Sequence, residues 1–329
     1  MIASAGERAS RRFLDFFAAS IDNDNTRMAY YRAVCSFFAW LKQHGIGELP
    51  DIEPLHVAAY LKALKVSEPG DPTLRQRAAA KPTVKQHLAA IRMLFDWLIV
   101  GQVLAINPAH AVRGPKHVVN RGKTPVLSED QARRLLESIK VAKKVALPDG
   151  SEAEVPWLVG LRDRALIGVM VYTFARISAV VAMQVEDYFP NGKRWWVRLH
   201  EKGGKRHEMP AHHKLEHFLD EYLAAAGIGD QDKTPLFRSA AGRTGALTDR
   251  PMHRVDAYAM VRRRTAEAGL KGKLGCHVFR ATGITAYLDA GGTLENAQAM
   301  AAHESPRTTK LYDRTADGIT LDEIERINI

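Results

Sequence analysis

The sequence predicts a mainly α-helical protein of two domains, with a small antiparallel β-sheet in the second domain. Apolar residues recur at helical spacing over most of the 329-residue chain. The stretch 194–210 instead predicts two strands. Apolar and polar residues alternate before a Gly-Gly pair that can turn the chain, and a second strand follows the pair. A basic segment with Gly and Pro at 113–125 separates the two regions.

The first domain, residues 1–112, is expected to be helical from residue 8 onward. The stretch "NTRMAYYRAVCSFFAWLKQHG" offers Asn25 or Thr26 as a cap and Gly45 as a stop. A second long helix, "KPTVKQHLAAIRMLFDWLIVG", ends at Gly101, and "EPLHVAAYLKAL" forms a shorter helix between the two. The aromatic residues lie on the apolar stripes, so they are assigned to the core rather than to a base-stacking surface.

Residues 113–125 are expected to form a basic linker between the domains. No acidic residue occurs between Asp96 and Glu129. The cations of this linker are Arg113, Lys116, Arg121 and Lys123. Such a segment suits either contact with a phosphate backbone or a solvated hinge, and the sequence does not decide between them.

The second domain, residues 126–329, is expected to begin with a helix that Ser128 caps, with Gln131 at the capping-box position. The stretch "LRDRALIGVMVYTFA" predicts a buried helix. The stretch "RWWVRLHEKGGKRHEMPAH" predicts two antiparallel strands, and residues 146–156 predict a loop or a small hairpin. The chain ends in a tail, residues 316–329, that carries a short apolar stripe.

The composition favours a nucleic-acid partner. The net charge is +10 and the pI is about 9.6, an excess that suits a polyanion. The two cysteines indicate neither a disulfide framework nor a metal cluster. No apolar run is long enough to span a membrane, and the N-terminus lacks the apolar segment of a signal peptide. We therefore expect a soluble cytoplasmic protein.

Four separated motifs of the second domain carry cations, histidines and a tyrosine: "TFARIS", "EKGGKRHEMP", "HVFR" and "AHESPRTTKLYDRT". Their order, with 26 residues from His277 to His303 and nine from His303 to Tyr312, resembles the tyrosine recombinase (phage integrase) family in an Xer-like form. The resemblance covers essentially the whole chain and implies a two-domain DNA clamp, with a helical core-binding domain and a catalytic domain. The residues that match the family's catalytic set are Arg176, Lys202, His277, Arg280, His303 and Tyr312.

The resemblance also implies a role for each of these groups. Tyr312 is the nucleophile that attacks a DNA phosphate and forms a 3′-phosphotyrosine. Arg176 and Arg280 hold the phosphate oxygens with their planar guanidiniums, and His303 donates a further hydrogen bond. His277 accepts the phenol proton. The nearby cations are expected to lower the pKa of the phenol from its usual value of about 10.

Two assignments keep alternatives. Lys202 and Lys205 compete for the role of general acid to the leaving 5′-hydroxyl; the family spacing selects Lys202 and leaves Lys205 for DNA backbone contact or solvent. Arg176 follows an apolar run, and a buried unpaired guanidinium is costly, so it needs an anionic partner. That partner is the DNA phosphate or an internal carboxylate such as Glu186 or Asp187.

Three positions depart from the family pattern. An acidic residue is common three positions after the first catalytic arginine, where this chain has Ala179. Ala281 stands where a histidine is common, and Ala302 replaces the usual glycine before His303. These departures leave the catalytic set itself intact and bear on its orientation and rate.

The predicted function is site-specific DNA recombination or integration without a cofactor. Further cations assigned to DNA backbone contact are Arg262, Arg263, Arg264, Lys271 and Lys273. The expected partner is double-stranded DNA with paired recombination sites, bound by a homo-tetramer that is a monomer or weak dimer when free and associates with the nucleoid. The tail docks on a neighbouring protomer or on its own domain. The competing functions are a type IB topoisomerase and a catalytically vestigial DNA-binding regulator.

Overall fold

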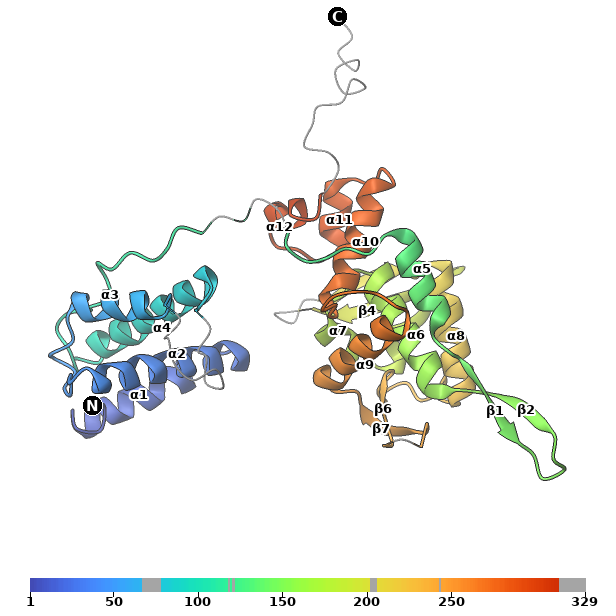
Figure 1. Cartoon of the computed structure of the whole chain (residues 1–329), viewed down its shortest axis with the longest axis horizontal. Helices are drawn as coiled ribbons and strands as arrows, with labels where there is room; N and C mark the ends of the chain where they lie inside the picture. Colours follow the sequence, from blue (N-terminus) through green and yellow to red (C-terminus); the bar gives the residue numbers. More distant parts are fainter. Residues whose placement is uncertain (67–77, 118, 120–121, 202–205, 243, 314–329) are drawn as a thin grey trace, which may run out of the picture. The chain divides into compact units, whose positions relative to one another are not determined.

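The chain folds into two compact units, residues 1–118 and 119–329. The computed structural model describes all residues except 67–77, 118, 120–121, 202–205, 243 and 314–329 (Figure 1). Helices dominate both units, and the strands form small antiparallel sheets in the second unit, which confirms the predicted fold class. The boundary between the units falls within the segment 113–125 that the sequence marks as a linker.

The first unit is a helical bundle with an aromatic core. Its helices are α1 (Glu7–Ala19), α2 (Asp24–Gln43), α3 (Pro54–Ala63) and α4 (Lys81–Val100). The stripes of α2 and α4 are buried against each other, with Phe37 and Phe95 among the fully enclosed side chains. This agrees with the assignment of the aromatic residues to the core.

The predicted cap of α2 is wrong by two or three residues. Asn23 is the N-cap, because its side-chain oxygen accepts from the backbone N–H of Thr26 at 3.1 Å. Asn25 and Thr26 therefore lie inside the first turn of the helix. The side-chain oxygen of an asparagine reaches the N–H of the third helical residue only from the N-cap position. Asn23 occupies that position, and Asn25 does not.

The second unit carries the remaining elements. Its helices are α5 (Glu129–Ser138), α6 (Leu158–Tyr172), α7 (Ile177–Val181), α8 (His213–Ala226), α9 (Arg254–Glu267), α10 (His277–Asp289), α11 (Leu294–Met300) and α12 (Pro306–Lys310), with a 3-10 turn at Val185–Asp187. Its strands are β1 (Ala142–Ala146), β2 (Glu152–Pro156), β3 (Tyr188–Asn191), β4 (Arg194–His200), β5 (Arg206–Pro210), β6 (Arg238–Ala240) and β7 (Leu247–Pro251).

Helix α6 lies at the centre of the second unit and packs against α8 and α10 (Figure 1). It is apolar around most of its circumference, as the sequence predicted for a buried helix. The predicted capping box of α5 is also present: the Ser128 side chain accepts from the Gln131 N–H, and the Gln131 side chain accepts from the Ser128 N–H.

The sheet β3-β4-β5 contains one strand more than predicted. The pair β4 and β5 is confirmed, with Val197 opposite Met209 in the register. Strand β3 was missed because Pro190 and Asn191 interrupt the alternation, and a turn with Gly192 at φ +62° joins it to β4. The segment 146–156 is part of a hairpin, in which β1 and β2 extend from the body of the unit as a two-stranded ribbon (Figure 1).

None of the helices in the described part of the chain combines the length and the apolar character that crossing a membrane requires. Among the described residues, no group of three or more His, Cys, Asp or Glu side chains is arranged to hold a metal ion.

Candidate active site

Tyr312 is held by backbone contacts from three parts of the second unit. Its own N–H donates to the Thr309 carbonyl at 2.9 Å, at the end of α12. The hydroxyl of Thr285 on α10 donates to the Tyr312 carbonyl at 3.1 Å. The N–H of Gly122 donates to the Leu311 carbonyl at 2.9 Å. The side chain is only 7% exposed, so the phenol is held in a buried environment.

Helix α10 supplies the two groups of the "HVFR" motif. His277 is its first residue, and its Nε2 lies 2.7 Å from the Tyr312 hydroxyl. Arg280, one turn later, is 1% exposed and donates to the carbonyls of Phe174 and Ala301. The Nε of Arg280 is buried without a hydrogen-bond partner in the described part of the chain. Two residues separated by 35 in sequence thus meet at one hydrogen bond, beside a buried guanidinium.

Two non-glycine residues near the carbonyls that hold Arg280 adopt left-handed backbone conformations. Phe174 has φ +56°, and Ala302, which follows Ala301, has φ +46°. Such conformations cost about 1–2 kcal/mol each for residues other than glycine and are often found at functional sites. The position before His303, where the family commonly has glycine, is therefore strained by alanine.

His303 lies on the other side of the phenol. Its ring is nearly parallel to that of Tyr312, with centroids 5.9 Å apart, and its Nδ1 lies 2.8 Å from the Thr309 hydroxyl. Burial, and then the charges of Arg280 and Arg176, lower the pKa of His303 to about 3. The ring is therefore neutral at physiological pH. If the Thr309 hydroxyl donates to Nδ1, the proton is on Nε2, which is then a hydrogen-bond donor.

The pKa of Tyr312 differs from the expectation. Burial raises the pKa of the phenol above its usual value, and this outweighs the opposing effect of Arg280 and Arg176. The cations act in the predicted direction, but the net shift in the free protein is upward. Burial and the same two arginines lower the pKa of His277, which leaves its imidazole neutral and able to accept a proton. A phenol with a raised pKa needs a base to accept its proton, and this imidazole lies within hydrogen-bond distance of it.

Arg176 has an internal carboxylate as partner, and it is neither of the two that the sequence suggested. Its Nη1 donates to the Glu201 carboxylate at 2.5 Å. Asp187 instead faces Arg198 and His200, at 3.6 and 3.3 Å. Glu201 directly precedes Lys202, which lies outside the described residues together with Lys205 and the tail 316–329.

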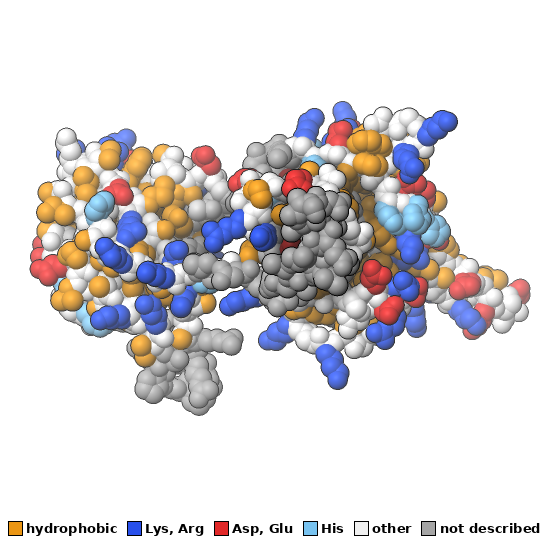
Figure 2. Space-filling view, turned by 90° about the horizontal axis from the view of Figure 1, so that it is seen from above, with side chains coloured by type: hydrophobic (Ala, Val, Ile, Leu, Met, Phe, Trp, Pro, Cys, Tyr) orange, Lys and Arg blue, Asp and Glu red, His pale blue; other side chains and the backbone are white. Residues whose placement is uncertain are grey.

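The cations predicted to contact DNA fall into different environments. Arg113, Lys116, Lys123, Lys271 and Lys273 are exposed, Arg262 is half-buried, and Arg121 lies outside the described residues. Figure 2 shows Lys and Arg side chains on the visible face of each unit. Their contact with DNA stays a prediction.

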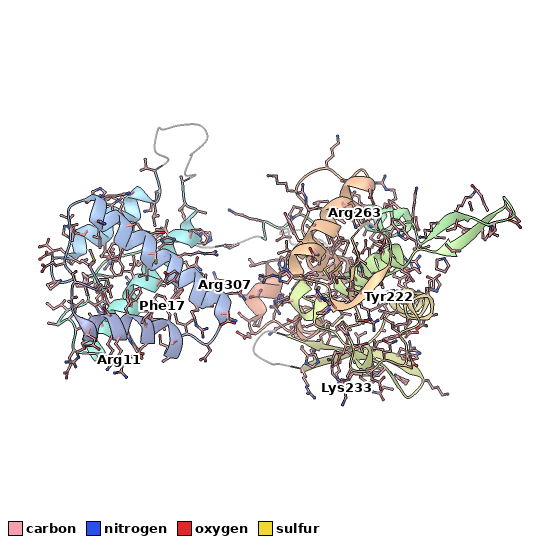
Figure 3. The ribbon with its side chains drawn as sticks, turned by 90° about the horizontal axis from the view of Figure 1, so that it is seen from below. Arg11, Phe17, Tyr222, Lys233, Arg263 and Arg307 are labelled. Carbon is pink, nitrogen blue, oxygen red and sulfur yellow. The ribbon has the colours of Figure 1, made fainter. Side chains whose placement is uncertain are left out.

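Arg264 is a correction to the predicted set. It is 3% exposed, and its guanidinium donates to Asp163 at 2.8 and 3.0 Å and to Glu267 at 2.9 Å. A buried guanidinium that is bound to two carboxylates is not available to a DNA backbone. Its neighbour Arg263, labelled in Figure 3, is exposed and also reaches Asp163, at 3.3 Å. Successive residues of one helix differ in this way because only one face of α9 is buried, where the helix packs against α5 and α7.

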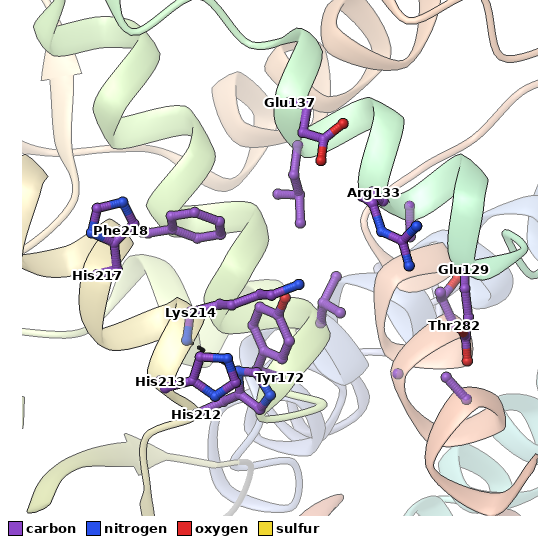
Figure 4. A pocket seen from close by; sticks show the side chains of 15 residues that line it. Glu129, Arg133, Glu137, Tyr172, His212, His213, Lys214, His217, Phe218 and Thr282 are labelled. Carbon is purple, nitrogen blue, oxygen red and sulfur yellow. Dashed lines mark hydrogen bonds between the residues drawn. The ribbon is translucent and has the colours of Figure 1, made fainter. Parts of the chain in front are cut away.

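A separate cavity of about 750 Å³ lies between α5, α6, α8 and α10 (Figure 4). Tyr172 stacks on His212 in its wall, with ring centroids 4.4 Å apart. None of the five described catalytic candidates lines this cavity, although Thr282 and Gly283 of α10 do. This cavity is therefore distinct from the cluster around Tyr312, which remains the candidate active site.

Sequence reasoning missed several groups that shape the cluster. These are Glu201, the hydroxyls of Thr285 and Thr309, and the carbonyls of Phe174 and Ala301. Of these groups, only Glu201 could have been predicted from the sequence. Strand alternation places it on the same side as Val197 and Leu199, which are fully buried. A carboxylate on that face requires a partner.

The fold and the cluster together define a class of protein. A phenol that contacts a neutral imidazole beside two guanidiniums is suited to attack on a phosphate group. The model described as the phage integrase family matches residues 125–318, more than half of the chain. The chain belongs to the phage integrase family of tyrosine recombinases.

Curated relatives match over most of their length. The chain is 26% identical to tyrosine recombinase XerD of Corynebacterium glutamicum over 298 residues, covering 90% of this chain and 89% of that protein. It is 27% identical to tyrosine recombinase XerC of Salmonella typhi over 242 residues, covering 72% and 71%.

Solved structures of recombinases on DNA share the fold. The XerH recombinase bound to its difH substrate, before cleavage, matches with a TM-score of 0.62 at 20% identity, covering 91% of this chain and 78% of that one. A lambda integrase tetramer bound to a Holliday junction matches with a TM-score of 0.66 at 17% identity, covering 94% and 79%.

Proposed function

We propose that this protein is a site-specific DNA recombinase that cleaves and rejoins DNA strands through a covalent phosphotyrosine at Tyr312. The observation that carries the proposal is the phenol oxygen 2.7 Å from Nε2 of His277, within a cluster that also contains Arg176 and Arg280. The family and the named tyrosine recombinase relatives support the same activity. They do not favour the type IB topoisomerase or the vestigial regulator.

In the proposed reaction the Tyr312 oxygen attacks the scissile phosphorus while the phenol proton passes to His277 Nε2. Arg280 Nε, which lacks a partner among the described residues, and the guanidinium of Arg176 are the donors for the phosphate oxygens. His303 is neutral, and in the tautomer that accepts from the Thr309 hydroxyl at Nδ1 it adds Nε2–H as a donor. The bond from phosphorus to the 5′-oxygen breaks, and Lys202 protonates that oxygen.

The phosphotyrosine conserves the energy of the phosphodiester bond. A 5′-hydroxyl from a second strand can therefore attack the phosphotyrosine, restore a phosphodiester and release the phenol without a nucleotide cofactor. Exchange between two sites requires more than one protomer. Lambda integrase forms a tetramer on a Holliday junction, and we extend this assembly on paired sites to the present protein.

A covalent-adduct assay tests the proposal. DNA that remains attached to the denatured protein from expressing cells is sequenced, and a nicked duplex of that sequence is then used as a trapping substrate. Wild-type protein is expected to form a covalent adduct. Tyr312→Phe is expected to bind the duplex with unchanged affinity and to form none, because it lacks the attacking oxygen.

The matched control is Tyr287→Phe, a half-buried tyrosine on α10 that packs against Phe174. This variant should form the adduct at the wild-type rate. An adduct formed by Tyr312→Phe would identify a different nucleophile. The absence of any adduct with the wild-type protein would refute the recombinase function.

A further inference from the structure

The cluster around Tyr312 contains a buried carboxylate that the family resemblance did not assign. Glu201 is 6% exposed and follows directly after β4, on the face where Val197 and Leu199 are fully buried. Burying a carboxylate without a charged or hydrogen-bonded partner costs several kcal/mol. Its partner is Arg176, 2.5 Å away across the junction between β4 and α7, which lie side by side (Figure 1).

The contact with Glu201 uses only part of the Arg176 guanidinium, which suits a positioning role. Glu201 accepts from Nη1 of Arg176, while the Arg176 side chain remains 35% exposed. A guanidinium has five N–H donors in a fixed plane, so one contact at Nη1 orients the plane and leaves other donors for a phosphate. Arg176 is also the N-cap residue of the short helix α7, whose backbone fixes only the start of this long side chain.

The charges of the described cluster support this arrangement. Arg176 and Arg280 are cationic, His303 and His277 are neutral, and Tyr312 is protonated. Glu201 is the carboxylate that acts on the guanidiniums here: it hydrogen-bonds Arg176 and opposes the effect of burial on the pKa of Arg280. One carboxylate against two guanidiniums leaves these described groups with an excess of one positive charge, which suits an anionic phosphodiester.

We propose that Glu201 is a positioning residue for strand cleavage: its carboxylate holds the Arg176 guanidinium in the orientation that binds the scissile phosphate. This inference rests on the proposed recombinase function. Ala179 lies one turn after Arg176, at the position where the family pattern has an acidic residue, and this alanine is buried and carries no charge. Glu201 supplies the missing carboxylate from a different element.

The test measures the single-turnover rate of covalent adduct formation on the nicked duplex, together with duplex affinity and melting temperature. Glu201→Gln keeps an accepting oxygen but removes the charge, and we expect a rate about 10-fold lower. Glu201→Ala removes the contact, and we expect a loss of about 100-fold, the typical effect of misplacing a reacting group by about 1 Å. Both variants should bind the duplex with wild-type affinity.

A matched control is Glu208→Gln, which makes the same change in the same sheet, where Glu208 pairs with Arg198 at 2.7 Å. This variant should cleave at the wild-type rate. A double-mutant cycle separates action through Arg176 from any other role: Glu201→Gln is introduced into Arg176→Lys. If Glu201 acts through the guanidinium, the second substitution should change the rate by less than about 2-fold.

If the wild-type protein forms the adduct, the recombinase function stands, and three results would then overturn the positioning role of Glu201. A wild-type or faster rate for Glu201→Gln would show that the carboxylate is dispensable or competes with the phosphate. Additive losses in the cycle would mean that Glu201 does not act through Arg176. A rate loss that only follows lost duplex affinity or lost folded protein would assign a structural role. If the wild-type protein forms no adduct, the positioning role fails together with the recombinase function.

Discussion

Asp163 is the centre of a buried ion network whose loss should strongly destabilise the second unit. Its side chain is fully enclosed, and each carboxylate oxygen accepts a two-pronged contact from a different arginine. Arg162 donates to one oxygen at 2.6 and 3.0 Å, and Arg264 donates to the other at 2.8 and 3.0 Å. The two arginines are 2% and 4% exposed, so water cannot replace the lost anion.

We expect Asp163→Asn to lower the free energy of unfolding by about 3–5 kcal/mol, the usual cost of removing one partner from a buried ion pair. The amide keeps the shape of the carboxylate, but its NH₂ group faces guanidinium donors, and the two buried arginines lose the anion that they share. Arg162 retains the Arg238 carbonyl at 2.8 Å and Arg264 retains Glu267, which limits the loss. The same substitution at Asp130, an exposed partner of Arg133, should cost about 0.2–1 kcal/mol.

The two units can unfold separately, so the assay must resolve them. Pulsed hydrogen exchange at increasing urea concentrations, read by mass spectrometry, gives the transition of peptides from α6 and α9. Peptides from α4 in the first unit serve as an internal reference and should not shift. A cost below about 1 kcal/mol for Asp163→Asn, equal to that of Asp130→Asn, would refute the argument that this network links α6 to α9.

Two further predictions concern the segment before Tyr312. Because the folded-state pKa of His303 is about 3, below its unfolded value of about 6.5, the unfolded chain binds more protons between these values. The free energy of unfolding should therefore fall as pH falls through this window, by at most about 1.4 kcal/mol per pH unit, and His303→Gln should flatten the curve measured by urea titration; an unchanged slope would contradict the pKa shift. Ala302→Gly should raise the free energy of unfolding by about 0.5 kcal/mol, since relief of the left-handed strain exceeds the entropic cost of glycine. Ala301→Gly, at φ −79°, is the control and should destabilise, and a loss at both positions would argue against strain at Ala302.

Local patterns in the sequence were sufficient for much of the architecture. The buried helix α6, the capping box of α5 and the pair of strands β4 and β5 follow from spacing over a few residues. The ordered arginine, histidine and tyrosine motifs also identified the family, because the chemistry of phosphate attack requires those side chains. The errors lay where two neighbouring residues offered the same signal, as at Asn23 and Asn25, or where proline broke the alternation in β3.

The sequence by itself predicted most of the elements and the candidate side chains for the chemistry, since both depend on residue type and on neighbours within a few positions. Only the tertiary structure decided how the charges pair. It placed Arg264 in the core on Asp163, and it gave Arg176 to Glu201 rather than to Glu186 or Asp187. It also raised the pKa of Tyr312 despite the nearby cations. These outcomes depend on burial and on contacts between elements far apart in the chain, and the strength of an electrostatic interaction is set by that environment.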